Sequence, residues 1–322
     1  MILLMIGYFA HAQYPTHLSG FVIQGRAQGT TYSIKYYGEL NQITKFEIDS
    51  LLAEIDQSMS TYNSNSLISE FNNPSTRKIR MDKHMRNVLL ASVDYHRLTK
   101  GFFDVTVFPL MKLWGFGPNG FKKSPAQSEI DSVRNLIGMR HLRIRNYHLI
   151  KRRKNVSIDL NGIAQGYTVD QLAMLLESKG VNNYLVELGG EIRTRGNKPE
   201  GPFVVEVQRP NSSTPAYRIR LKDIAITTSG NYEKQIIVDG KTVSHHMNPI
   251  TATPLQSSII SATVIAKTAM EADALDNFFM YLTPDKALHV VEKLKDVEIY
   301  LIYFDNNTYK ELQSSGFYNY IY

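Results

Sequence analysis

The sequence predicts an α+β fold in which helices pack against mixed, largely antiparallel sheets. The first observation is that strand-like and helix-like segments follow one another without regular alternation, and hairpin-like neighbours are common. The second is the composition: 43% of the 322 residues are hydrophobic and 20% are charged, which is typical of a globular protein with a substantial core. The third is that no run reaches the roughly 18 apolar residues that a membrane span needs.

In the first half of the chain, side-chain periodicity predicts one strand and two long helices. Residues 30–37 alternate like a strand, and apolar residues at helical spacing predict helices over residues 44–59 and 82–99. Residues 115–128 are rich in Gly, Pro, Lys and Ser, which is typical of a surface loop. We expect this loop to mark a boundary between two lobes.

The second half of the chain contains more strands than helices. Turn-forming residues bound the runs that predict strands, and apolar residues at helical spacing predict the helices. The expected elements are a helix near residues 128–137, strands between residues 142 and 158, a helix ending at Gly180, strands at residues 184–188, 203–208 and 217–221, a helix over residues 268–282, a helix beginning at Pro284, and a terminal strand over residues 298–304.

The N-terminus bears on where the protein works. Residues 1–10 are apolar, and Ala10-His11-Ala12 before Gln13 fits a signal-peptidase site, although a frayed apolar N-terminus is the alternative. We therefore expect a signal peptide over residues 1–12, a domain over residues 13–322, and export to the periplasm. The chain has no cysteine, which excludes disulfides, thiol chemistry and a lipid-modified cysteine.

The charge distribution bears on partners. The net charge of +6 comes from scattered basic residues, with one cluster at residues 151–154. Such a cluster is typical of a solvated turn, and it could also help to hold an anionic ligand. Because no nucleic-acid-binding motif surrounds it, nucleic acid is not an expected partner.

Residues 158–170, IDLNGIAQGYTVD, form the most informative segment. A short strand-like run carries Asp159, breaks at Asn161-Gly162 and turns into an apolar helix. An acid, a helix-capping Asn and a bare glycine at a strand-to-helix corner suit a phosphate or a metal, because helix N-termini present unpaired N–H groups. The alternative is an ordinary Asn-capped helix whose glycine eases a turn.

A second candidate site lies on the helix near residues 269–277. Asp273, Asp276 and Asn277 stand at positions i, i+3 and i+4, so their side chains share one face. Two carboxylates and a carboxamide oxygen suit a hard cation such as Mg²⁺. The alternative is a solvated acidic face, although the surrounding apolar residues argue against full exposure.

Two polar segments are ambiguous. His245 and His246 precede the turn at Asn248-Pro249, and a histidine there can act as an acid or base near neutral pH or can be an ordinary loop residue. Residues 227–232 read as a polar turn that binds phosphate or ribose, or that simply caps a bend. No Walker P-loop, dinucleotide-binding G-x-G-x-x-G or hydrolase G-x-S-x-G motif is present.

Taken in order, eight short segments resemble the FAD:protein FMN transferase family, the ApbE-like flavin transferases. They are GTT at 29–31, MSTY at 59–62, GFFDVT at 101–106, IDLNGIAQG at 158–166, ELGGE at 187–191, TSG at 228–230, HHMNPIT at 245–251 and ADALDN at 272–277. Each segment is weakly specific, but together they span about residues 25–300. The resemblance implies two lobes that form one ApbE-like domain.

The resemblance also implies an activity. Such enzymes are exported, depend on Mg²⁺ and bind FAD as a substrate. They cleave its pyrophosphate and attach FMN through a phosphoester to a Thr or Ser of an acceptor flavoprotein, releasing AMP. The rival interpretations are an FAD pyrophosphatase that produces FMN and AMP, and a non-catalytic flavin-binding protein.

The site residues follow from the resemblance, position by position. FAD would lie against Gln28, Tyr62, Asp104, Val105, Thr106, Asp159, Gln165 and Met247. The metal would take the backbone carbonyl of Gly162 together with Asp273, Asp276 and Asn277. His245 would activate the acceptor hydroxyl.

The chain departs from the family pattern at several of these positions. The family usually has Met in place of Gln28, Lys in place of Gln165, Asp in place of Asn248 and Gly in place of Ala252, and often Thr in place of Asn277. The missing lysine removes a phosphate partner, which predicts weaker FAD binding. Asn277 still offers an oxygen to Mg²⁺.

Overall fold

The computed structural model describes residues 18–116, 124–210, 212, 214–231, 235–238, 241–244 and 246–322. The expected signal peptide over residues 1–12 and the proposed base His245 lie outside these residues. In the described ranges, no helix has the length and apolarity that crossing a membrane requires.

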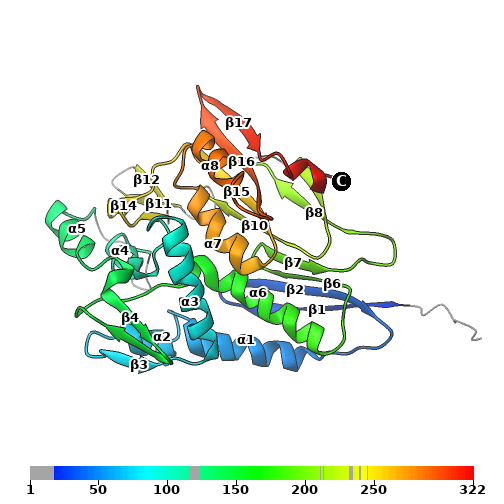
Figure 1. The fold of residues 1–322 in the computed structure, drawn as a ribbon, viewed down its shortest axis with the longest axis horizontal. Coiled ribbons are helices and arrows are strands. Elements are labelled where there is room, and N and C mark those ends of the chain that lie inside the picture. The colour runs from blue at the N-terminus through cyan, green and yellow to red at the C-terminus, as the bar shows by residue number, and fades with distance from the viewer. Residues whose placement is uncertain are drawn as a thin grey trace, which may run out of the picture.

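One eight-stranded sheet organises the molecule, and all its neighbouring strands are antiparallel. Figure 1 shows β1 and β2 at one edge and β17 at the other. In spatial order the strands are β1 (Ser19–Ala27), β2 (Thr30–Gly38), β6 (Tyr184–Leu188), β7 (Glu191–Arg195), β10 (Ala225–Gly230), β15 (Ile259–Ala266), β16 (Glu298–Asp305) and β17 (Thr308–Gln313). The predicted α+β class with largely antiparallel sheets is confirmed.

Two tight hairpins in this sheet contain two of the family-like segments, GTT at 29–31 and ELGGE at 187–191. Gln28 and Gly29 connect β1 to β2 with φ values of 51° and 78°, and Gly189 and Gly190 connect β6 to β7 with φ values of 65° and 110°. A two-residue hairpin with positive φ at both positions matches the right-handed twist of its strands, and glycine adopts it readily.

Three helices lie near one another on one side of the sheet (Figure 1). They are α1 (Lys45–Met59), α6 (Asn161–Ser178) and α7 (Ala269–Phe279). Thr44 caps α1 in a capping box with Glu47, and Thr268 caps α7 by accepting from the N–H of Glu271. Helix α6 contacts β6 and β7, while α7 contacts β7, β10 and β15 and also packs along α6.

The opposite face of the sheet is covered by a hairpin, β8 (Phe203–Gln208) and β9 (Pro215–Leu221), and by η3 (Phe317–Tyr320). Strand alternation divides the side chains of β10 between the two faces. Ile226 packs in the cluster beneath the hairpin, whereas Ala225 packs in a cluster on the helical side.

A smaller three-stranded sheet accompanies α2 and α3. Its strands, in spatial order, are β3 (Lys78–Arg80), β5 (His148–Lys151) and β4 (Leu142–Arg145), next to α2 (Leu67–Asn72) and α3 (Lys83–Leu98). The remaining elements are η1 (Val105–Val107), α4 (Phe108–Leu113), α5 (Gln127–Arg134), η2 (Met139–His141), β11 (Gln235–Val238), β12 (Lys241–Ser244), β13 (Met247–Asn248), β14 (Thr253–Pro254) and α8 (Pro284–Val291).

Most predicted elements are confirmed, and the errors are specific. The expected terminal strand at residues 298–304 is β16, but β17 follows it and forms the edge of the sheet. The helix expected near residues 128–137 ends at Arg134. Residues 117–123 of the loop expected at 115–128 lie outside the described residues, so the boundary between two lobes stays a prediction.

Candidate active site

The segment that leads into α6 is not a strand, so this part of the sequence prediction is wrong. The side chain of Asn72 takes the place of a neighbouring strand: its Oδ1 accepts from the N–H of Ile158 at 2.7 Å, and its Nδ2 donates to the Ile158 carbonyl at 2.8 Å. The N–H of Asp159 donates to the carbonyl of Val105 at 2.8 Å. One side-chain amide and one loop carbonyl therefore satisfy a backbone that a sheet would otherwise satisfy.

The expected Asn cap on α6 is also wrong. Asn161 is the first residue of the helix, and Leu160 occupies the cap position without a side-chain bond. Instead, Oδ1 of Asp159 accepts from the N–H of Asn161 at 2.8 Å. Burial raises the pKa of Asp159 to about 6, against the opposing effect of this hydrogen bond. A carboxylate, not a carboxamide, thus faces the N-terminal turn of α6.

The structure brings the four proposed metal-binding residues together where α6 meets α7. Gly162 has non-helical angles (φ −82°, ψ 17°), and a Cβ placed on it would lie 3.6 Å from Nδ2 of Asn277. The N–H of Gly166 donates to Oδ2 of Asp273 at 2.8 Å. In a regular helix that N–H donates to the carbonyl of Gly162, so this arrangement leaves the Gly162 oxygen with capacity for another ligand.

The carboxylates at this junction are buried, and the described side chains supply no compensating cation. Burial raises the pKa of Asp273 to about 7. Burial, followed by the charge of Asp273, raises the pKa of Asp276 well above its usual value, and the Thr227 hydroxyl opposes that rise. No cationic side chain in the described ranges contributes to either pKa. Two buried acids without a cation are costly, which favours a bound cation between them.

The donor set is made of oxygens. Within the described ranges, no group of three or more His, Cys, Asp or Glu side chains is placed to hold a metal ion. The candidate set therefore combines two carboxylates with the side-chain oxygen of Asn277 and the backbone oxygen of Gly162. Hard cations such as Mg²⁺ prefer this kind of donor, and they usually keep water or substrate oxygens as further ligands.

Strand β10 supplies site residues that the sequence analysis misread as a turn. Because side chains alternate along a strand, Thr227 and Ser229 lie on the face that carries α7, whereas Thr228 pairs with Thr263 at 2.9 Å on the other face. The hydroxyl of Ser229 donates to Oδ1 of Asn277 at 3.4 Å and bonds Nε2 of His246 at 2.8 Å. The β-branched residues Ile226, Thr227 and Thr228 were the available signal, and the hydroxyl-rich composition obscured it.

The proposed flavin contacts at residues 104–106 form a buried turn beside Asp159. Oδ1 of Asp104 accepts from the N–H of Thr106 at 2.8 Å and from its hydroxyl at 2.5 Å. Burial raises the pKa of Asp104 against these bonds, and Nδ1 of His96 lies 3.5 Å from Oδ2 of Asp104. Because the carbonyl of Val105 accepts from the N–H of Asp159, residues 104–106 and Asp159 are joined by a backbone hydrogen bond.

The glutamine candidates lie near the hairpin turns. Nε2 of Gln28 donates to Oγ1 of Thr168 on α6 at 2.9 Å, and Gln28 lines a pocket formed by residues 26–30. Half-buried Gln165 points towards the other turn, since a Cβ on Gly189 would lie 3.0 Å from its Nε2. Both side chains are therefore associated with α6.

Two further candidates differ sharply in exposure. Tyr62 is 75% exposed, whereas Met247 is 3% exposed within an apolar cluster. The carbonyl of Met247 accepts from the hydroxyl of Tyr281 at 2.8 Å. Tyr62 is thus free to stack on a planar ring, whereas the side chain of Met247 is buried and its carbonyl is hydrogen-bonded within the protein.

The fold is shared with flavin transferases. A model of the ApbE family matches residues 28–301. The FAD:protein FMN transferases of Vibrio cholerae and Escherichia coli are 34% and 33% identical, each over 92% of this chain and over 91% and 88% of the relative. The solved structure of the flavin transferase ApbE from Vibrio cholerae superposes with a TM-score of 0.87 at 33% identity, covering 95% of this chain and all of that one.

A second solved structure agrees with the first. The flavinyl transferase ApbE of Pseudomonas stutzeri in its apo form has a TM-score of 0.85 at 30% identity, and it covers 95% of this chain and 97% of its own. The protein is therefore an enzyme of the flavin transferase class. The chain belongs to the ApbE family, the FAD:protein FMN transferases.

Proposed function

We propose that this enzyme transfers the FMN moiety of FAD to a Thr or Ser hydroxyl of an acceptor protein, in a Mg²⁺-dependent reaction that releases AMP. The single observation that carries the proposal is the buried pair Asp273 and Asp276, which meets Asn277 and the kink at Gly162 without a cationic partner among the described side chains. The names of the relatives supply the substrate and the transferred group.

The residues present fit Mg²⁺. Asp273, Asp276, the side-chain oxygen of Asn277 and the carbonyl of Gly162 would hold the ion. When bound, Mg²⁺ supplies positive charge that offsets the negative charge of the pyrophosphate. The N-terminal turn of α6 adds N–H groups and the positive end of a helix dipole next to the same junction.

The transfer step balances as a substitution at phosphorus. The acceptor hydroxyl oxygen forms a bond to the phosphorus of the FMN half, and the bond between that phosphorus and the bridging oxygen breaks. AMP leaves with the bridging oxygen, and the hydroxyl proton passes to a base, for which we propose His245. Such general base assistance is worth about 10²- to 10⁴-fold in rate.

The chain positions the flavin half through α6 and its surroundings. Asp159 and residues 104–106 would line the nucleotide, and Tyr62 would stack against a ring. Gln28 and Gln165 would donate hydrogen bonds where the family usually has Met and Lys. Neutral donors contribute less to phosphate binding than a charged side chain does.

Incubation with FAD, Mg²⁺ and an acceptor protein carrying the target Thr tests the proposal. We expect a covalently fluorescent acceptor band on a denaturing gel, equimolar AMP, and loss of both on addition of EDTA. An acceptor with the target Thr changed to Val is the matched control. AMP without labelled protein would contradict transfer and indicate water as the acceptor, while tight FAD binding without AMP would contradict catalysis.

We also propose that the protein is exported with cleavage after Ala12, on the basis of the apolar residues 1–10 and the Ala-His-Ala sequence. The protein recovered from the periplasm of an expressing cell is expected to have the intact mass of a chain that begins at Gln13. Recovery of protein that still begins at Met1 in the cytoplasm would contradict the proposal.

A further inference from the structure

Helices α6 and α7 are joined by three contacts that repeat every four residues. Gly162 lies against Asn277, and Gly166 donates to Asp273 at 2.8 Å. The third contact is Asp170, whose Oδ1 and Oδ2 accept from the N–H groups of Ala269 and Met270 at 3.0 Å each. The residue numbers rise on α6 as they fall on α7, so the helices are antiparallel and one register links all three contacts.

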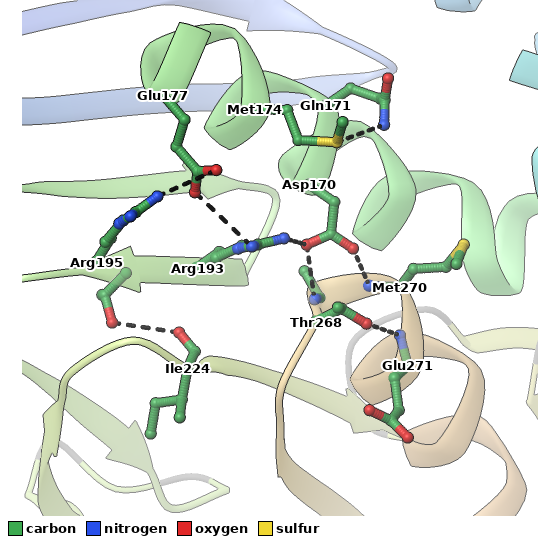
Figure 2. A network of polar contacts seen from close by, with 12 residues as sticks. Asp170, Gln171, Met174, Glu177, Arg193, Arg195, Ile224, Thr268, Met270 and Glu271 are labelled. Carbon is green, nitrogen blue, oxygen red and sulfur yellow. Dashed lines mark hydrogen bonds and ion pairs between the residues drawn. The ribbon is translucent and has the colours of Figure 1, made fainter. Parts of the chain in front are cut away.

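Asp170 occupies the end of this interface furthest from the proposed metal residues. Figure 2 shows its carboxylate between Arg193 on β7 and the first turn of α7. Nη1 of Arg193 donates to Oδ1 of Asp170 at 2.7 Å, and Nη2 lies 3.9 Å from Glu177. Asp170 is 6% exposed, so its hydrogen bonds form away from water. It ties α6, α7 and the sheet together at one point.

At the middle contact, Gly166, the backbones of α6 and α7 are too close for any side chain. A Cβ added to Gly166 would lie 2.3 Å from the carbonyl oxygen of Ala269 and 2.8 Å from Cβ of Asp273. The backbones therefore approach closely there, and a glycine is what permits it. With the helices in direct contact, sliding along the axis is the remaining freedom, and one residue of slip is about 1.5 Å.

We propose that Asp170, held by Arg193, is a positioning residue for the metal site. By binding the first N–H groups of α7, it fixes the register of α7 on α6, and so fixes the Gly162 carbonyl relative to Asp273, Asp276 and Asn277. The inference rests on the proposed Mg²⁺-dependent function. The new element is that Asp170, two helical turns from Gly162 along α6, sets the geometry of the metal site.

The ratio of the Mg²⁺ and Ca²⁺ dissociation constants tests this role, because a loss of stability alone would not change that ratio. Mg²⁺ demands near-ideal geometry at about 2.0–2.1 Å, whereas Ca²⁺ accepts variable geometry at about 2.3–2.6 Å. A loosened register should therefore weaken Mg²⁺ binding more than Ca²⁺ binding. A purely structural cap would lower Tm in the absence of metal and leave both dissociation constants unchanged in the folded protein.

The experiment compares Asp170→Asn with Glu177→Gln by calorimetric titration of Mg²⁺ and of Ca²⁺ into the full-length protein. Asn keeps one acceptor oxygen but replaces the oxygen that meets the N–H of Met270. Glu177 lies on the same helix and contacts the same arginine, but among the described residues it pairs with the sheet and not with α7, and its change to Gln removes the same charge. We expect the Mg²⁺ Kd to rise about 10- to 100-fold in Asp170→Asn, as for other residues that support metal ligands. The Ca²⁺ Kd should rise less, and Glu177→Gln should match the wild type.

Arg193→Lys is the second variant, in case Asp170→Asn does not fold. It keeps the charge but loses the planar fork of donors, and we expect a smaller loss of Mg²⁺ affinity in the same direction. Equal Mg²⁺ affinities in wild type, Arg193→Lys and Asp170→Asn would overturn this inference and leave the proposed function intact. A wild-type protein that neither binds Mg²⁺ nor needs it for AMP release would overturn both.

Discussion

The two ends of the α6–α7 interface bury acids in opposite ways. At one end, Asp170 has Arg193 and two backbone N–H groups as partners. At the other, Asp273 and Asp276 are as deeply buried, yet no cationic side chain of the described residues offsets them. The first arrangement has its counter-charge within the protein, whereas the second has none among the described side chains, which is why we propose a cation there. Burial of a carboxylate therefore does not indicate its role until its counter-charge is identified.

The largest expected effect comes from removing an acid at the uncompensated end. Asp273→Ala should lower Mg²⁺-dependent AMP release about 1000-fold, because the cation loses a charged ligand in the transition state. Glu271→Gln removes a charge from the same helix and should leave the rate unchanged. The comparison fails if the two variants show equal rates.

The next effect concerns the close approach that joins the two ends. Gly166→Ala places a methyl group 2.3 Å from a backbone oxygen, so the helices must separate. We expect about a 100-fold loss of AMP release from the displaced ligands, together with a lower Tm. Gly162→Ala adds a methyl group at ordinary contact distance, 3.6 Å, and keeps the carbonyl. A loss as large in Gly162→Ala as in Gly166→Ala would contradict this account.

The pH dependence of stability should detect the buried acid Asp273. The pKa of Asp273 is raised to about 7 in the folded protein, above its unfolded value of about 3.9. The folded state then binds more protons, so the free energy of unfolding of the metal-free protein should fall as pH rises from about 4 to 7. Asp273→Asn should show a shallower fall, because burial also raises the pKa of Asp276, Asp159 and Asp104, and these groups still titrate in the variant. Urea unfolding in EDTA at several pH values measures it, and parallel curves for the two proteins would refute it.

The smallest expected effect comes from adding a positive charge at residue 165 on α6. Gln165→Lys restores the residue that the family usually carries, and it should lower the KM for FAD about 3- to 10-fold through a charged contact with phosphate. Gln165→Met is the matched control for side-chain length without charge. An unchanged KM in the lysine variant would show that residue 165 does not face the phosphates.

Local sequence patterns predicted much of this molecule. The helices that begin next to Thr44 and Asp82 were predicted because the spacing of apolar residues is a short-range signal. The i, i+3, i+4 spacing of Asp273, Asp276 and Asn277 correctly placed three oxygen donors on one helix. What it could not reveal is the contact with Gly162 on α6, because that pairing depends on how two distant helices pack.

The same limit explains the errors and omissions. The role of Asp170 was missed because its partners, Arg193 and the start of α7, are distant in the sequence. Residues 227–230 were read as a turn because hydroxyl-rich segments favour turns when isolated, whereas here two strands flank them. Asp159 was assigned to a strand because nothing in the local sequence shows that the Asn72 side chain, and not a neighbouring strand, pairs with the backbone of Ile158.

That imitation by Asn72 has a kinetic consequence. The amide of Ile158 is held by a side chain on α2, 86 residues earlier in the chain. Its hydrogen can exchange with solvent only when α2 moves or Asn72 changes rotamer, so its protection reports the opening of a helix that belongs to a different part of the fold. The corner that carries Asp159 should therefore form late in folding, after the N-terminal helices have docked, and should open with them.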